Sequence, residues 1–201
     1  MMPAPHRLRH GIRRRLAAAG TAAAAVALLF TAAPTAVAAP APAPAALTTT
    51  WGDFTCDGGL YRIKAPTTRE LFLTVALSPG NHGSVIQYFW GNESNQKWIY
   101  CHRPEADGTE TVVFQDSWRH WCLAVGSDAM FYGAWIVTTG CFSDHIPTEQ
   151  QFVKTKVPGT NLFALQGQHS RKWVTASGTF GQNGNQIIQG DQPDLYVLQP
   201  V

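Results

Sequence analysis

The chain has 201 residues, of which 14% are charged, and 15 Lys and Arg against 13 Asp and Glu give it a net charge of +2. Five of the arginines lie in the first fifteen residues, and residues 1–50 contain no acidic residue. Without residues 1–38 the chain has 10 basic and 13 acidic residues, which excludes a polybasic nucleic-acid-binding surface as the leading function. The aromatic content of 11% argues against disorder, and the length allows one domain of ordinary size.

Residues 1–38 have the pattern of an export signal. Basic residues from His6 to Arg15 precede an apolar stretch, and Ala36-Val37-Ala38 is typical of a cleavage site. A membrane anchor is the alternative, but the apolar stretch is rich in Ala and is followed by small residues rather than by charge. We therefore predict a secreted, extracellular protein with no membrane insertion. The Ala- and Arg-rich signal indicates a bacterial source and leaves both the Sec and the Tat export routes open.

Residues 39–55 are rich in Ala, Pro and Thr and are predicted to form an extended linker. From Trp51 onward, short runs of β-branched and aromatic residues alternate with Gly, Asn, Asp and Pro. No segment shows a sustained helical apolar stripe, so the pattern predicts an all-β fold of many short strands. The clearest expected strands are 71–75, 83–89, 111–114, 134–137 and 185–188.

An internal repeat of 50 to 51 residues organises these strands. Phe72, Cys122 and Trp173 each lie eleven residues before a glycine, and an isoleucine follows each glycine by three residues. Each unit ends with Gln-x-aromatic or a relic of it. Three units are too few for a propeller, and no helix per unit is present for a solenoid. The glycines are Gly83, Gly133 and Gly184, the isoleucines are Ile86, Ile136 and Ile187, and the closing aromatics are Trp98, Phe152 and Tyr196.

Three four-stranded units that end with Gln-x-Trp resemble the ricin-type β-trefoil, the lectin-like Q-x-W repeat family. The resemblance covers residues 56–201 and implies repeats at about 56–105, 106–157 and 158–201. It is best preserved in the first repeat, which ends with Asn95-Gln96-Lys97-Trp98. The three closing aromatic side chains are expected to meet near a pseudo-threefold axis and to fill the centre of the barrel.

Four cysteines in an oxidising compartment allow three disulfide pairings. A zinc site is the alternative, but the sequence contains no Cys-x-x-Cys pair. The family resemblance implies a bond between Cys122 and Cys141 within repeat two, which leaves Cys56 to pair with Cys101. We expect neither a metal nor a cofactor.

The resemblance also implies one shallow sugar site per repeat, in which a carboxylate accepts hydrogen bonds from hydroxyl groups and a ring stacks on a pyranose. Only repeat one keeps most of these places, and it has a threonine where the family has its aspartate. Asn and Gln side chains there have an alternative role, which is to satisfy backbone groups. The predicted carbohydrate-binding residues are Thr74, Gln87, Phe89, Asn95 and Gln96.

Repeat two has an apolar loop tip, Met130-Phe131-Tyr132, where the other repeats have polar turns. Exposed apolar patches commonly mark interfaces, so the tip suggests contact with a protein partner. Alternatively, the tip packs back onto Trp118 and Trp121.

The sequence contains neither Gly-x-Ser-x-Gly nor His-Glu-x-x-His, and no phosphate-binding loop, so we predict that the protein is not an enzyme. The leading hypothesis is a secreted carbohydrate-binding module with one degenerate site in repeat one, whose partner is a cell-surface glycan or a polysaccharide. Such a module would serve as a cell-surface targeting subunit. The alternative is a trefoil that contacts protein and binds no sugar, as an adaptor subunit of a secreted toxin complex or as a protease inhibitor.

Overall fold

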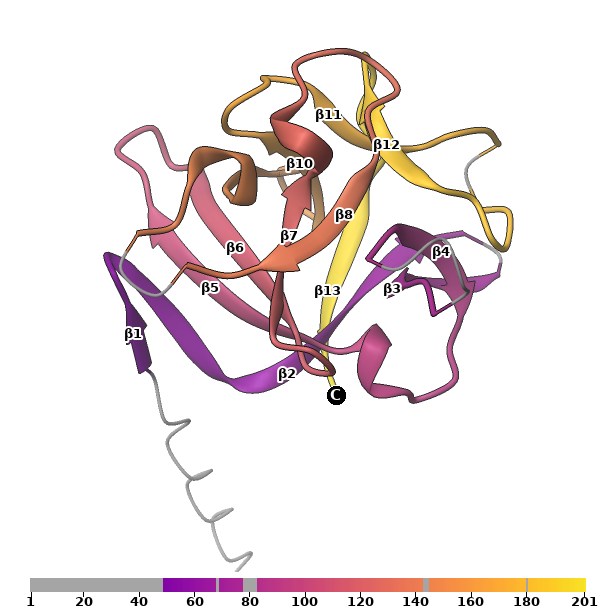
Figure 1. The fold of residues 1–201 in the computed structure, drawn as a ribbon, viewed down its shortest axis with the longest axis horizontal. Coiled ribbons are helices and arrows are strands. Elements are labelled where there is room, and N and C mark those ends of the chain that lie inside the picture. The colour runs from indigo at the N-terminus through magenta and orange to yellow at the C-terminus, as the bar shows by residue number, and fades with distance from the viewer. Residues whose placement is uncertain (1–48, 68, 78–82, 143–144, 180) are drawn as a thin grey trace, which may run out of the picture. The chain divides into compact units, whose positions relative to one another are not determined.

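The structure, a computed structural model, describes residues 49–67, 69–77, 83–142, 145–179 and 181–201. The predicted signal and most of the linker lie outside the described residues. The described part of the chain is built from strands and short 3₁₀ turns, which confirms the all-β prediction (Figure 1). In repeat one the strands are β2 (Phe54–Pro66), β3 (Glu70–Val75), β4 (Val85–Phe89) and β5 (Trp98–Pro104), preceded by β1 (Thr49–Trp51).

Repeats two and three contribute four strands each. Repeat two contains β6 (Glu110–Asp116), β7 (Trp121–Val125), β8 (Ile136–Gly140) and β9 (Phe152–Lys156). Repeat three contains β10 (Leu162–Gly167), β11 (Trp173–Ala176), β12 (Ile187–Gly190) and β13 (Tyr196–Pro200). The 3₁₀ turns are η1 (Ser94–Gln96), η2 (Gly126–Asp128) and η3 (Thr148–Gln150).

The first and fourth strands of each repeat form a closed barrel. Antiparallel pairing runs from β2 to β5, β6, β9, β10 and β13, and β13 returns to β2. The second and third strands of each repeat form a hairpin, namely β3–β4, β7–β8 and β11–β12. Closure leaves the barrel strands without a free edge, and the three hairpins extend from one barrel. This arrangement is the predicted β-trefoil.

The three hairpins meet one another through equivalent backbone contacts. Single β-bridges join Ser84 to Val137, Trp135 to Ile188 and Gln186 to Ile86. Each bridge links one hairpin to the next, so that the pseudo-threefold symmetry of the barrel continues into the hairpins.

The closing aromatic residues of the repeats lie where the sequence predicts. Trp98, Phe152 and Tyr196 have no exposed surface and belong to one core cluster. Two of them bond to the adjoining hairpin: Trp98 Nε1 donates to Leu73 O at 3.1 Å, and Tyr196 Oη donates to Val174 O at 3.4 Å. Each large side chain therefore both fills the barrel and ties a hairpin to it.

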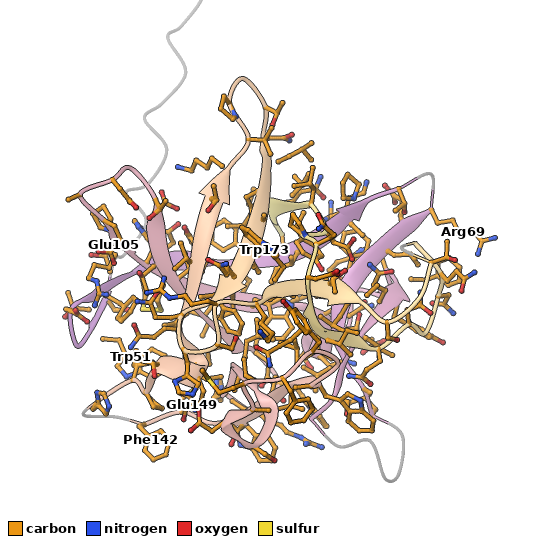
Figure 2. All side chains as sticks on the ribbon, turned by 90° about the horizontal axis from the view of Figure 1, so that it is seen from above. Trp51, Arg69, Glu105, Phe142, Glu149 and Trp173 are labelled. Carbon is orange, nitrogen blue, oxygen red and sulfur yellow. A yellow bond between two sulfur atoms is a disulfide. The ribbon has the colours of Figure 1, made fainter. Side chains whose placement is uncertain are left out.

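The disulfides are Cys56–Cys101 and Cys122–Cys141, as the family resemblance implies. Cys56 and Cys101 lie opposite each other on β2 and β5, and Cys122–Cys141 closes the β7–β8 hairpin. At the start of the domain, Trp51 Nε1 donates to Phe142 O at 3.2 Å, and Figure 2 shows the two side chains on the same side of the molecule.

The register of the first hairpin corrects one prediction. Val75 pairs with Val85, whereas Val125 pairs with Ile136 and Ala176 with Ile187. Val85, not Ile86, is therefore the equivalent of the two other isoleucines. The physical reason is a loop that is shorter by one residue: only Ser84 lies between Gly83 and the first paired residue, whereas two residues lie there in each of the other repeats. Burial agrees, since Val85 has no exposed surface and Ile86 is partly exposed.

Candidate functional site

The register shift places Gln87 on the opposite face of β4 from the one that the sequence analysis gave it, and it places Phe89, the last residue of β4, one position beyond the platform place. A slip of one residue exchanges the two faces of a strand. Tyr88 pairs with Phe72, as Thr139 pairs with Cys122 and Gly190 with Trp173, so Tyr88 takes the place that the sequence analysis gave to Phe89. Likewise, Ile86 takes the place given to Gln87.

Gln87 lies on the inner face of its hairpin and is fully buried. Its Oε1 accepts a hydrogen bond from the backbone N–H of Gly181 at 3.0 Å, across the contact between the first and third hairpins. Gln87 does not line the depression described next, and its position gives it a structural role.

A depression of about 290 Å³ lies between the first hairpin and η1. It brings together four of the five predicted residues, Thr74, Phe89, Asn95 and Gln96. The other lining residues were not predicted, and they include Ile86, Tyr88 and Glu93.

The predicted polar residues form the base of this depression and bond mainly within the protein. Gln96 Nε2 donates to Phe89 O at 2.6 Å and to Thr74 Oγ1 at 3.1 Å, and Gln96 Oε1 accepts from Gly91 N at 2.6 Å. Asn95 Nδ2 donates to Val75 O at 2.7 Å. The backbone-satisfying role that the sequence analysis left open therefore applies to both amides. They hold β3, β4 and η1 together beneath the surface.

The groups that remain open to a ligand lie at the rim. The Tyr88 and Phe89 side chains are each 46% exposed, and their ring centroids are 6.2 Å apart. Glu93 is exposed, and its carboxylate makes no hydrogen bond or ion pair with any described residue. Glu93 thus brings a carboxylate to a depression that has Thr74 at the place of the family's aspartate. Because its place follows the hairpin by four residues, no family motif points to it.

The other two repeats have corresponding depressions with different linings. In repeat two a depression of about 400 Å³ is lined by Phe131, Trp135 and Val137, and none of its described lining residues is charged. In repeat three a depression of about 550 Å³ is lined by Thr175, Asp191 and, from repeat two, Tyr132. The three surfaces therefore differ in chemistry although the backbone repeats.

Asp194, at the end of repeat three, is used inside the protein. Its Oδ2 accepts hydrogen bonds from the Thr175 hydroxyl at 2.9 Å and from the Ala176 N–H at 2.7 Å. Burial raises the pKa of the Asp194 carboxyl, although both hydrogen bonds oppose that rise. Asp194 thus takes the place of the closing glutamine, and its hydrogen bonds link the end of the repeat to its hairpin.

The apolar tip of repeat two is exposed. Met130, Phe131 and Tyr132 have exposed fractions of 54%, 65% and 61%. Trp121 begins β7, whereas the tip follows the end of that strand, so the structure argues against packing of the tip onto Trp118 and Trp121. The guanidinium of Arg119 instead lies 3.9 Å from the Trp118 ring centroid.

In the described ranges of the chain, no three His, Cys, Asp or Glu side chains gather as a metal site requires. Within the same ranges, no helix has the length and hydrophobicity that a membrane crossing needs.

No protein-family model matches the sequence, and no relative was found among curated proteins. Solved structures, in contrast, share the fold. The designed 3-fold symmetric protein ThreeFoil matches with a TM-score of 0.58 at 21% identity, over 71% of this chain and 99% of that protein. The ricin B-like lectin of Macrolepiota procera, solved in complex with lactose, matches with a TM-score of 0.52 at 14% identity, over 71% of this chain and 95% of the lectin.

An enzyme also contains this fold. An exo-β-1,3-galactanase from Clostridium thermocellum matches with a TM-score of 0.58 at 14% identity, over 72% of this chain but only 31% of the enzyme. The chain thus spans less than a third of the galactanase. With the closed barrel, the three hairpins and the buried Trp98, Phe152 and Tyr196, these likenesses show that the domain has the β-trefoil fold of the ricin-type lectins.

Proposed function

We propose that the domain binds carbohydrate through the depression of repeat one. The observation that carries this proposal is the pair of exposed rings, Tyr88 and Phe89, beside the carboxylate of Glu93, which pairs with no described residue. A ring offers a flat apolar surface to the C–H face of a pyranose, and a carboxylate accepts hydrogen bonds from two hydroxyl groups. The lectin-like solved structures support this function at the level of the fold.

The depression favours neutral sugars or amino sugars. Glu93 forms no ion pair with a described residue that would offset its charge, so it repels a uronic or sialic acid. A single shallow site buries little area, and we expect a dissociation constant in the millimolar range, roughly −4 kcal/mol.

A binding function accounts for the lining better than catalysis does. Glycoside hydrolysis commonly needs two carboxyl groups on either side of the scissile bond. The described residues that line the depression of repeat one include a single carboxylate, Glu93. We therefore place the domain with the carbohydrate-binding proteins rather than with the glycosidases.

We infer that the protein acts outside the cell as a targeting module. Two disulfides are compatible with an oxidising compartment, and the sequence pattern of residues 1–38 favours export. Its partner is then a cell-surface glycan or a polysaccharide.

Binding of the purified protein to a glycan array tests the proposal, with many copies of the protein displayed on each bead so that a millimolar site becomes detectable. Tyr88→Ala and Phe89→Ala each remove a stacking surface and should abolish detectable binding without unfolding the domain. Trp135→Ala is the matched control, because it removes an exposed ring from repeat two and should leave binding unchanged. If the wild type binds glycan and Tyr88→Ala binds equally well, the site is wrong. If the wild type binds no glycan, the function is wrong.

One observation favours a second candidate function, contact with a protein. Phe131 and Trp135 are 65% and 52% exposed and line the uncharged depression of repeat two. Large exposed apolar patches commonly mark protein interfaces. A partner that copurifies with the wild type and is lost with Phe131→Ala, but not with Tyr88→Ala, would support an adaptor role.

A further inference from the structure

The turn between β6 and β7 carries an arginine that stacks on two tryptophans. Arg119 Cζ lies 3.9 Å from the centroid of the Trp118 ring and 4.9 Å from that of the Trp121 ring, both within the range of a cation–π interaction. The two indoles remain 39% and 37% exposed. None of these three residues lines the depressions of the three repeats. Together they form a separate surface, the Arg119 cluster.

Hydrogen bonds hold the backbone of this turn in one conformation. The buried carboxylate of Asp116 accepts bonds from the backbone N–H groups of all three cluster residues, at 2.6 to 3.0 Å. Ser117 joins the turn to η1, since its N–H donates to Lys97 O and its hydroxyl to Ser94 O, both at 2.9 Å (Figure 1). The cluster is therefore organised before any ligand binds, which lowers the entropy that binding would cost.

The guanidinium of Arg119 is partly exposed and makes no hydrogen bond or ion pair with any described residue. Asp116 belongs to the same turn, but the backbone N–H groups occupy both of its carboxylate oxygens. Stacking on a ring uses the flat face of a guanidinium, whereas its N–H donors lie in the plane of the group. Arg119 thus keeps a planar fork of donors, which matches the two oxygens of a carboxylate.

The equivalent turn of repeat three shows that the backbone does not require the aromatic side chains. In both turns a glutamine side chain donates to the carbonyl of a residue with a φ of 59°, which is His120 or Arg171. Repeat three has Lys172 at the place of Trp121, and its Nζ lies 4.0 Å from the centroid of the Tyr132 ring. The side chain at this place is used within the molecule in repeat three and is open to solvent in repeat two, which points to a binding role for the indoles.

We propose that the Arg119 cluster is a docking site for a protein partner, in which the guanidinium pairs with an Asp or Glu carboxylate and the two indoles pack against an apolar side chain beside it. Arg and Trp are among the residue types most enriched at the centres of protein interfaces. A stacked guanidinium is also more weakly hydrated than an ammonium, so its pairing costs less desolvation. The site is independent of the proposed sugar site and of the depression of repeat two.

Charge complementarity selects an acidic protein segment over a polyanion. Without residues 1–38 the chain has 10 basic and 13 acidic residues, so its overall charge repels nucleic acid and acidic polysaccharides. The cluster offers one cation between apolar surfaces, which matches one carboxylate with an apolar neighbour. A protein segment supplies both groups on adjacent residues.

Selection of random linear peptides displayed on phage, against the immobilised protein, tests the proposal. We expect the enriched peptides to carry Asp or Glu next to an apolar residue. Fluorescence polarisation then measures the affinity of a selected peptide. Arg119→Ala should weaken its binding about tenfold, and Arg119→Lys nearly as much, because an ammonium lacks the planar fork. Arg171→Ala is the matched control, since it removes an exposed arginine from the equivalent turn and should leave the affinity unchanged.

A peptide whose acid is replaced by the corresponding amide completes the test. It should bind the wild type about tenfold more weakly than the acidic peptide does, and Arg119→Ala should weaken it no further, because the two groups act as a pair. This comparison on the wild-type protein stays decisive even if Arg119→Ala lowers stability.

Four outcomes would overturn the proposal. These are the enrichment of no peptide, the enrichment of peptides without an acid, peptide binding that survives Arg119→Ala, and equal binding of the acidic and amide peptides. Binding of alginate that depends on Arg119, with no acidic peptide selected, would assign the cluster to an acidic glycan instead. None of these results bears on the proposed function, because Arg119 does not line the depression of repeat one.

Discussion

At the centre of the barrel, equivalent places of the three repeats hold Trp98, Phe152 and Tyr196, and all three side chains are fully buried. At the hairpins, equivalent places hold Tyr88, Thr139 and Gly190, all on a surface that water reaches. The barrel places must be large and apolar because a smaller side chain would leave a cavity. The hairpin places carry no such requirement. The difference shows that the fold constrains the interior of a repeat and leaves its surface chemistry free to change.

Trp98→Ala tests the requirement for a large side chain at the centre of the barrel. The substitution removes a fully buried side chain and its hydrogen bond to Leu73 O. We expect the free energy of unfolding to fall by about 3–5 kcal/mol, measured by urea denaturation. Trp135→Ala, at a 52% exposed position, should change it by less than about 0.5 kcal/mol. Equal effects of the two variants would contradict the division between interior and surface.

Removal of the disulfide of repeat two is expected to have the next largest effect on the free energy of unfolding. Cys122→Ala combined with Cys141→Ala opens a loop with a sequence separation of 19 residues. The chain-entropy relation predicts a loss of roughly 3 kcal/mol. Urea denaturation of the double variant under non-reducing conditions measures the loss. Free thiols in the intact mass of the wild-type protein would contradict the pairing itself.

An ion-pair network between β6 and β9 gives the barrel a dependence on pH. Burial favours the neutral form of Glu110, but hydrogen bonds from Lys156, Lys154 and Tyr100 outweigh it and lower the pKa of the carboxyl to about 2. Ionised Glu110 therefore stabilises the fold above about pH 4.5, and this contribution is lost as the pH falls toward 2. The Lys154 and Glu110 side chains are only 9% and 18% exposed, so solvent screens the pair weakly.

Glu110→Gln should lower the free energy of unfolding by about 2–3 kcal/mol at pH 7, because it leaves buried Lys154 without its carboxylate. The difference from the wild type should shrink at pH 3, as urea denaturation at both pH values would show. Glu70→Gln is the control, since Lys64 lowers the pKa of Glu70 through an exposed, solvent-screened ion pair, and the dependence on pH should be much smaller. A difference that is independent of pH would refute the role of the charge.

The smallest expected effect is on sugar affinity, and it tests the comparison at the hairpin surface of repeat one. Glu93→Gln keeps the shape of the repeat-one rim and removes its charge, so sugar affinity should fall by about 1 kcal/mol. Glu149→Gln, at a partly exposed acid of repeat two, should leave affinity unchanged. Titration of each variant with a sugar that the wild type binds, followed by NMR, measures the two affinities. A loss with Glu149→Gln that equals the loss with Glu93→Gln would show that overall charge, not the site, governs binding.

Patterns spaced along the chain predicted the interior well. The repeat of 50 to 51 residues and its closing aromatics led to the trefoil, and the family resemblance to both disulfides. Burial links these features to sequence because a core place accepts few residue types. The position of Trp98 at the end of its repeat was therefore enough to predict that this side chain lies in the core.

The register of the first hairpin needed the structure. Val85 and Ile86 are both apolar and adjacent, so the sequence offers no signal to choose which one faces the core. The choice follows from a loop that is one residue shorter, and it decides whether Tyr88 or Phe89 stands at the platform place. Thr74, Asn95 and Gln96 lie outside the shifted strand, and all three line the depression.

The sequence alone was enough to predict the class of fold, the repeats and the residues that fill the core, because burial restricts core positions to a few residue types. Which groups share a surface became visible only in the folded chain. Glu93 reaches the repeat-one depression from a loop beyond the hairpin, and Tyr132 crosses from repeat two to the depression of repeat three. The position of Glu93 depends on how the loop after β4 folds back beside its own hairpin. The position of Tyr132 depends on how neighbouring hairpins pack, through contacts such as those of Gln189 with the tip. Residues that meet only through packing have no characteristic spacing in the sequence.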